Sequence, residues 1–345
     1  MAHPYLQSLL VRHYGDRRLV AEQYEASRRW LELVQKESGF IIREGLSDHE
    51  SLERTETAQL VTPLYHQAAR IVSSLARLLG RSDYAVRHAG LAEAVRSAYF
   101  EQVLPPAPDR YEALTQAGLA AALELGIFPD GDRAAAERAL VRKVESTQGP
   151  HVTAGIFGTK FVLTALSGAG RADLAFELVA RREYPGWGYM IKRGATTLWE
   201  HWDFSDNTFS HNHPMFGSVS EWLFSWLAGI QPAPDAVGFD RIIIRPQPVG
   251  DLTWVKGGVQ TARGEVRSDW RIEKGRFLLD VAVPPNTKAV VHLPGTDPAA
   301  VLESGRPASA AAGVRILGRE AGAVVLEIGS GRYRFASPWP AIKSR

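Results

Sequence analysis

The sequence predicts a mainly α-helical domain followed by a smaller β-domain. From residue 5 to about 230, apolar residues recur at three- and four-residue spacing between short turn-forming segments. After 231–235 (Gln-Pro-Ala-Pro-Asp), short apolar runs alternate with Gly, Pro and Asn, as in an antiparallel sandwich. No segment repeats at a fixed period, which argues against a regular solenoid and favours a toroid of helical hairpins. We therefore predict a helical domain at 1–235 and a β-sandwich at 236–345.

Composition and charge exclude several classes of partner. The 345 residues suffice for two domains, and a net charge of +2 gives no reason to expect nucleic acid or an anionic membrane as a partner. The absence of Cys excludes disulfides and thiolate metal sites. The first residues lack the basic and apolar segments of a signal peptide, and no apolar run reaches membrane-spanning length. A soluble, cytoplasmic protein is the expectation.

The helical domain is expected to consist of hairpins. Apolar stripes place helices at about 5–11, 19–34, 56–79, 84–100, 111–125, 133–145, 157–166, 171–180 and 219–227. Gly80 is expected to end the third helix, and the prolines at 105–108 to break the chain after the fourth. Short connectors between Ala- and Leu-rich helices favour antiparallel pairs, with functional residues on the loops at one end.

The β-domain is expected to be accessory to the helical one. Its strand-like runs are 242–244, 252–255, 264–270, 277–283, 289–293, 324–328 and 333–335.

Four loops carry more polar and charged groups than a connector requires, namely 45–50, 149–155, 186–203 and 210–214. The stretch 186–203 contains three tryptophans together with Glu200, His201 and Asp203. A carbohydrate pocket needs such a mixture, because indole faces stack on sugars while carboxylates and imidazoles bind hydroxyls. Glu200 is therefore the candidate catalytic carboxylate. The alternative is a buried aromatic cluster with one satisfied glutamate.

The motifs that carry a family resemblance are Trp187-Gly188-Tyr189-Met190, Gly194 through Glu200, Asn212-His213, Phe216-Gly217, Glu221-Trp222-Leu223, the loop from His151 to Thr159, Arg245-Pro246 and Pro284 to Thr287. Together they resemble the bacterial α-L-rhamnosidases of glycoside hydrolase family seventy-eight. The resemblance covers nearly the whole chain. It implies an (α/α)6 barrel, a C-terminal β-sandwich and no cofactor.

The resemblance implies hydrolysis of terminal α-L-rhamnosyl groups in plant glycosides or bacterial polysaccharides. The family inverts configuration with two carboxylates, and Glu200 stands at the position of the general base that activates water. An acid on the opposite side protonates the leaving oxygen, with the two carboxyl groups about 6.5–9.5 Å apart.

The sequence departs from the family at the general acid. The family carries this residue upstream, in a segment ending in Gly-Trp-x-Gly-Asp, and that pattern is absent from these 345 residues. Eight or nine expected helices also fall short of twelve. We therefore expect an incomplete (α/α)6 toroid that is inactive alone and is completed by its N-terminal part, with a homo-oligomer as the other way to cover exposed helix faces.

Two other classes of function stay open. The chain could be a non-catalytic, sugar-binding remnant. It could also be another enzyme on a helical toroid, but a phosphorylase needs a phosphate site and a lyase needs basic groups, of which Lys192 and Arg193 alone lie near the stretch.

The remaining candidates are assigned to substrate binding. Asp48 is either a sugar contact or a helix cap, and His49 stands where the family carries a stacking Trp. Glu50 could replace the acid only if it reached the glycosidic oxygen, which we do not expect. His151 and His213 are expected to bind hydroxyls, the alternative being hydrogen-bonded loop histidines, and no metal is predicted because neither has a second ligand at metal-site spacing.

Each tryptophan of the stretch 186–203 is expected either to stack on a sugar or to pack in the core. At least one of Trp187, Trp199 and Trp202 is expected to line the pocket. Glu221 is interpreted as a structural residue.

Overall fold

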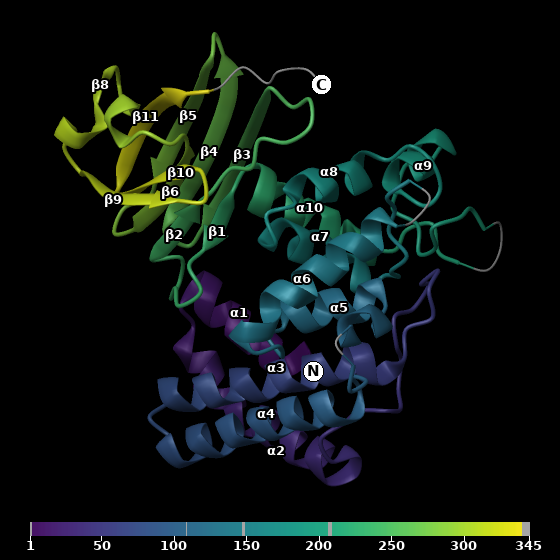
Figure 1. Ribbon diagram of the computed structural model, residues 1–345. Helices are drawn as coiled ribbons and strands as arrows, with labels where there is room; N and C mark the ends of the chain where they lie inside the picture. Colours follow the sequence, from purple (N-terminus) through teal and green to yellow (C-terminus); the bar gives the residue numbers. More distant parts are fainter. Residues whose placement is uncertain (1, 108, 147–148, 206–208, 340–345) are drawn as a thin grey trace. The chain divides into compact units, whose positions relative to one another are not determined.

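A computed structural model gives the fold (Figure 1) and describes residues 2–107, 109–146, 149–205 and 209–339. The chain divides into two compact units. The helical unit contains the chain up to Ser8 and Arg18–Ser220, and the β-rich unit contains Leu9–Arg17 and the chain from Glu221 onward. None of the helices in the described ranges is long and apolar enough to span a membrane.

The predicted fold class is confirmed, with ten α-helices within the described ranges. They are α1 (Ala2–Tyr14), α2 (Arg17–Ser38), α3 (Thr57–Leu78), α4 (Ser82–Gln102), α5 (Gln116–Glu124), α6 (Asp130–Glu145), α7 (Gly158–Gly168), α8 (Ala172–Ala180), α9 (Trp187–Lys192) and α10 (Ser218–Trp222). Gly80 adopts a φ of 71°, so the chain turns directly after α3 into α4.

Helix α5 is the buried centre of the helical unit. It packs against α3, α6 and α7, and α7 packs against α8 (Figure 1). Every residue of α5 from Gln116 to Leu123 is buried. Three of them are the consecutive alanines 120–122, whose small side chains let the neighbouring helices approach closely.

Two parts of the helical unit differ from the prediction. The expected helix at 111–125 is broken, because residues Arg110–Ala113 form a 3₁₀ turn and Leu114 is extended. Thr115 then caps α5, since its hydroxyl oxygen accepts a hydrogen bond of 3.1 Å from Gly118 N. The stretch 186–203, expected as a loop, begins with the short helix α9.

The β-rich unit is a two-sheet sandwich. One sheet has the order β1-β2-β6-β10-β9 and the other β3-β4-β5-β11-β7-β8. The strands are β1 (Ile230–Pro232), β2 (Arg241–Ile244), β3 (Trp254–Thr261), β4 (Gly264–Glu273), β5 (Arg276–Val283), β6 (Lys288–Pro294), β7 (Leu302–Glu303), β8 (Arg306–Pro307), β9 (Val314–Glu320), β10 (Ala323–Ile328) and β11 (Gly331–Pro338).

Side chains from both sheets form one core. Val291 and Leu326 of the first sheet are fully buried with Trp270 and Phe277 of the second. One pair departs from the predicted antiparallel pattern, because β2 and β6 are parallel. Strands β1, β7, β8 and β9 were not predicted: three are only two or three residues long, and β9 has no buried residue.

Candidate active site

The loop after residue 47 is fastened to the segment that precedes α7. Leu52 N donates to Thr153 O at 2.9 Å, and Ile156 N donates to His49 O at 2.9 Å. A Cβ on Gly155 would lie 1.9 Å from His49 O. Because no side chain fits there, glycine is what allows the two backbones to meet, and this contact places His49.

Asp48 anchors the same loop with its carboxylate. Oδ2 accepts from Gly155 N at 2.7 Å, and Oδ1 accepts from Phe157 N at 3.1 Å and Gly158 N at 2.9 Å. Burial raises the pKa of Asp48, while these three amides oppose the rise. With 6% of its surface exposed, Asp48 fits the helix-capping alternative, since it satisfies free amides at the start of α7. Its sugar contact stays a prediction.

The segment that carries Glu200 is joined by backbone hydrogen bonds to the segment that contains Ser210 and His213. Glu200 N donates to Ser210 O at 2.9 Å, and His213 N donates to Leu198 O at 2.9 Å. The carboxylate is held as well, because its Oε2 accepts from Ser210 N at 3.0 Å. About 22% of the side chain remains exposed. Glu200 therefore presents a fixed carboxylate that water can reach.

Four titratable side chains converge at this point. His49 Nε2 lies 3.2 Å from Glu50 Oε1 and 3.7 Å from Glu200 Oε1. His201 Nε2 lies 3.5 Å from Glu50 Oε2. Two carboxylates thus approach one imidazole, and a second imidazole holds the far oxygen of Glu50. We call these residues, His49, Glu50, Glu200 and His201, the Glu200 cluster.

Two members of the Glu200 cluster were not among the predicted site residues. The sequence pattern suggests Glu50 only as a replacement acid, and His201 only as a polar residue of the stretch 186–203. Glu50 has a φ of 59°, which is uncommon outside glycine. The proximity of Glu50 to His201 arises from the meeting of two distant loops, so no spacing in the sequence signals it.

The three tryptophans of the stretch lie in the core. Exposure is 7% for Trp187, 3% for Trp199 and zero for Trp202. Trp202 Nε1 donates to Ala154 O at 2.9 Å, and its ring centroid lies 3.9 Å from that of Phe216. An indole without exposed surface has no face to offer a sugar, so the structure corrects the platform role for Trp202 and shows little ring surface for the other two.

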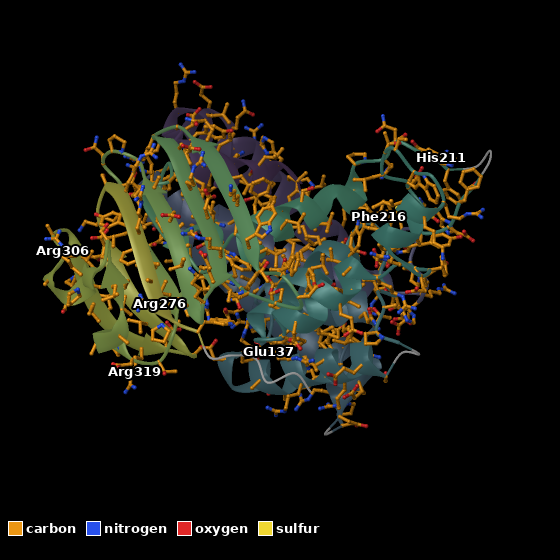
Figure 2. The ribbon with its side chains drawn as sticks, turned by 90° about the horizontal axis from the view of Figure 1, so that it is seen from above. Glu137, His211, Phe216, Arg276, Arg306 and Arg319 are labelled. Atoms are coloured by element: carbon orange, nitrogen blue, oxygen red, sulfur yellow. The ribbon has the colours of Figure 1, made fainter. Side chains whose placement is uncertain are left out.

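Trp187 and Trp202 stabilise the loops instead. Their rings meet edge to face at 5.2 Å, and Trp187 Nε1 donates to Phe216 O at 3.1 Å. Phe216 and His211, labelled in Figure 2, come from the segment that pairs with Glu200. The aromatic cluster therefore supports the backbone on which Glu200 stands.

Exposed aromatic surface near the Glu200 cluster comes from phenylalanines. Phe204 is 40% exposed and contacts Trp199 edge to face, with centroids 5.4 Å apart. Phe209 stacks on His201 at 4.9 Å. Composition favoured the tryptophans, whereas the exposed ring here belongs to Phe204, and Phe209 is half-buried.

Asp203 ends the stretch. Its Oδ1 accepts a hydrogen bond of 2.6 Å from the Tyr189 hydroxyl. This bond holds the pKa of Asp203 below its ordinary value and raises that of Tyr189.

The two predicted loop histidines are not members of the Glu200 cluster as defined above. His151 Nδ1 is 2.9 Å from Gly149 O, within its own loop. The Nδ1 atom of His213 is buried and has no hydrogen-bond partner among the described residues. Their hydroxyl-binding roles stay predictions. Within the described ranges, no group of three or more His, Asp or Glu side chains is arranged to hold a metal ion.

Comparisons with known families match both parts of the chain. The family described as bacterial alpha-L-rhamnosidase 6 hairpin glycosidase domain matches residues 3–227. The bacterial alpha-L-rhamnosidase C-terminal domain matches residues 229–306.

Individual proteins with similar sequences are also named alpha-L-rhamnosidases. The chain is 32% identical over 337 residues to an alpha-L-rhamnosidase of Streptomyces avermitilis, covering 94% of this chain and 31% of that relative. It is 27% identical over 298 residues to an alpha-L-rhamnosidase of Formosa agariphila, covering 81% of this chain and 32% of that relative.

Solved structures show the same fold. The S. avermitilis alpha-L-rhamnosidase complexed with L-rhamnose has a TM-score of 0.86 at 30% identity, over 96% of this chain and 32% of that one. The alpha-L-rhamnosidase from Dictyoglumus thermophilum has a TM-score of 0.85 at 28% identity, over 96% and 38%. The chain thus spans about a third of the length of these relatives. Because the six-hairpin family matches well over half of its residues, this chain belongs to the bacterial α-L-rhamnosidase family of glycosidases.

Proposed function

We propose that the chain contributes the general base to the hydrolysis of terminal α-L-rhamnosides by an inverting mechanism, and that Glu200 is this base. The observation that carries the proposal is the setting of the Glu200 carboxylate. One oxygen is fixed by the amide of Ser210, and the other lies 3.7 Å from His49 Nε2 with part of the side chain open to water. A fixed, accessible carboxylate can accept a proton from water.

The proposed step is a single displacement. A water oxygen bonds to the anomeric carbon as the bond from that carbon to the leaving oxygen breaks. The water gives one proton to Glu200, and the leaving oxygen takes a proton from a general acid. We propose that this acid lies outside these 345 residues, since the sequence has no Gly-Trp-x-Gly-Asp segment. It would come from an N-terminal part or from another copy of the chain.

The substrate class is proposed from the relatives. They are named alpha-L-rhamnosidases, and one was crystallised with L-rhamnose. We accordingly propose a rhamnose-containing glycoside or polysaccharide as substrate.

Glu50 is proposed as a positioning residue. Its two oxygens face two different imidazoles, at 3.2 Å from His49 Nε2 and 3.5 Å from His201 Nε2. It would hold His49 against Glu200.

The second candidate function is a non-catalytic, sugar-binding protein. The burial of all three tryptophans weakens it, because a binding remnant would be expected to keep an exposed indole platform in this stretch. The exposed Phe204 is the aromatic surface that such a function would use.

Substrates that differ only in the leaving group separate the two candidates. Fluoride departs without a proton from the protein, so α-L-rhamnosyl fluoride requires the base but not the acid. We expect the 345-residue chain to hydrolyse the fluoride and to leave a methyl α-L-rhamnoside intact, because loss of a general acid costs about 10²–10⁴-fold. Failure to turn over the fluoride, with L-rhamnose still bound, would favour the non-catalytic function.

A further inference from the structure

The β-rich unit has an exposed tryptophan that is not part of its hydrophobic core. Trp254 begins β3, the edge strand of its sheet, and is 61% exposed. The core of the sandwich contains Trp270 and Phe277 but not Trp254. An indole left open to water gives no stability through burial, and its exposed ring surface is available to a ligand.

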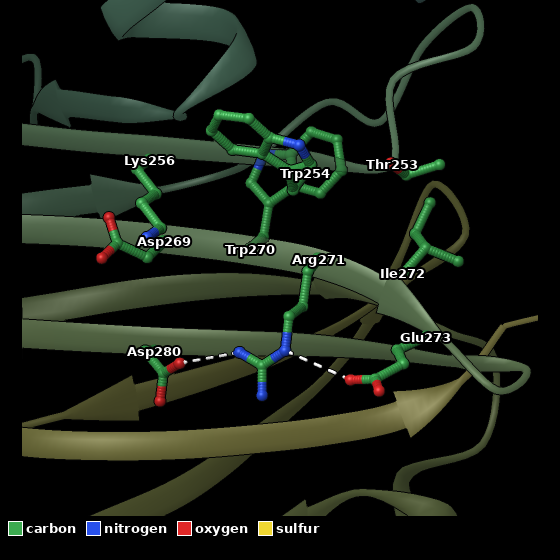
Figure 3. A pocket seen from close by; sticks show the side chains of 9 residues that line it. All are labelled: Thr253, Trp254, Lys256, Asp269, Trp270, Arg271, Ile272, Glu273 and Asp280. Carbon is green, nitrogen blue, oxygen red and sulfur yellow. Dashed lines mark hydrogen bonds and ion pairs between the residues drawn. The ribbon is translucent and has the colours of Figure 1, made fainter.

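Trp254 borders a hollow of about 570 Å³, drawn in Figure 3. The charged side chains of this hollow are Lys256, Asp269, Arg271, Glu273 and Asp280. Pairing between strands places them on one face, because Trp254 lies opposite Arg271, and Lys256 opposite Asp269. We call this surface the Trp254 face. Its size falls in the range of small-ligand sites.

Three charged side chains of the Trp254 face are paired with one another. Arg271 Nη1 lies 3.1 Å from Asp280 Oδ2, and Arg271 Nε lies 3.5 Å from Glu273 Oε2 (Figure 3). The neighbouring Trp270 is 1% exposed, and its Nε1 donates to Leu227 O at 2.7 Å. Ion-paired side chains have less conformational entropy to lose when a ligand binds.

The charges of the Trp254 face select the ligand class. Two cations, Lys256 and Arg271, stand among three carboxylates, so the hollow does not attract a polyanion. The hollow therefore offers both hydrogen-bond donors and acceptors beside the exposed indole of Trp254. A neutral pyranose matches this pattern, because its C–H face stacks on an aromatic ring and its hydroxyls both donate and accept.

We propose that the Trp254 face is a carbohydrate-binding site for a neutral glycan, separate from the Glu200 cluster. Trp254 is the stacking platform. Arg271 donates to the sugar hydroxyls, and Asp269 and Asp280 accept from them. The site holds a glycan chain and performs no chemistry, so it does not depend on the hydrolytic role proposed for Glu200.

Affinity gel electrophoresis of the 345-residue chain tests the proposal. The gels contain dextran or larch arabinogalactan as neutral glycans, or heparin as a polyanion. We expect at least one neutral glycan to retard the wild-type chain, and Trp254→Ala to weaken that binding by about tenfold or more, since a lost aromatic contact has that order of effect. Trp254→Phe should retain part of the binding.

Two control variants make the outcome specific. Leu317→Ala removes a 45% exposed apolar side chain from β9, in the other sheet, and should leave the retardation unchanged. Glu200→Gln should also leave it unchanged, because the two sites are separate. The proposal is overturned if no neutral glycan retards the chain, if heparin alone does so, or if Trp254→Ala binds as wild type while its thermal unfolding is unaltered.

Discussion

His49 Nε2 lies 3.7 Å from Glu200 Oε1, although the two residues belong to loops far apart in the sequence. The backbone of the His49 loop is fixed by Asp48 and by the close approach to Gly155. The carboxylate of Glu200 is fixed by Ser210. The fold of the helical unit therefore places the imidazole of His49 beside the carboxylate of the candidate base.

Removing the imidazole should lower catalysis without unfolding the protein. For His49→Ala we expect kcat on α-L-rhamnosyl fluoride to fall by about 10–10²-fold, because a small misplacement of a catalytic group has effects of this size. His49→Gln should recover part of the rate by contacting Glu50 and Glu200. His3→Ala, which removes an imidazole bonded to Ser27, is the matched control and should keep the wild-type rate. Equal rates for His49→Ala and His3→Ala would contradict a positioning role.

Gly155→Ala should displace the His49 loop. The added Cβ would meet His49 O at 1.9 Å and Ser51 N at 2.7 Å, so one backbone must move. We expect a loss of stability of about 2 kcal/mol or more in urea unfolding, together with loss of fluoride hydrolysis. Gly90→Ala in the middle of α4, where a Cβ meets no atom within 4 Å, should instead stabilise by roughly 0.5–1 kcal/mol. A neutral effect at Gly155 would show that the backbones do not meet as described.

Asp48→Ala tests the anchoring carboxylate. It leaves the amides of Gly155, Phe157 and Gly158 without their acceptor, so we expect a loss of about 3 kcal/mol in the free energy of unfolding. Asp83→Ala, in the first turn of α4, should cost no more than about 1 kcal/mol. Similar small losses for both variants would refute the anchoring role.

Glu124 should make the stability of the helical unit depend on pH. Burial raises its pKa from 4.5 to about 7, with Glu137 adding to the rise and Arg133 and Lys160 opposing it (Glu137 is labelled in Figure 2). The folded state therefore binds this proton more tightly than the unfolded state. Its contribution to stability is complete below about pH 4.5 and is lost as the pH rises through 7.

Glu124→Gln removes this titration. The free energy of unfolding of the wild type should fall relative to that of Glu124→Gln by about 3 kcal/mol between pH 4.5 and 8, measured by urea unfolding. Glu93→Gln replaces a side chain that is 63% exposed, and its pH dependence should match the wild type. Parallel curves for wild type and Glu124→Gln would contradict the raised pKa.

The spacing of apolar residues predicted most of the fold, because burial of one face of each helix or strand determines that spacing. Helix α3 was expected at 56–79 and spans Thr57–Leu78, since its apolar stripe is long and Gly80 ends it. The region 111–125 was misread as one helix because its apolar residues continue through the break. There the Thr115 cap starts a new helix, and a cap adds no interruption to the apolar pattern.

The site was predicted less completely because its contacts are tertiary. Glu200 was singled out by its aromatic neighbours, yet those neighbours turn inward, and the imidazoles of His49 and His201 surround the carboxylates instead. Adjacent residues on an irregular loop can point in different directions, which residue type alone does not reveal. The role of Glu50 depends on two loops meeting, which requires the fold.

The most direct test of the central claim is the rate of α-L-rhamnosyl fluoride hydrolysis by Glu200→Gln relative to the wild-type chain. Gln keeps the shape of the side chain and can still accept the bond from Ser210 N, but it cannot take a proton from water. We predict that the rate falls by about 10²–10⁴-fold while L-rhamnose binding and the thermal transition are retained. A rate equal to that of the wild type would contradict Glu200 as the general base.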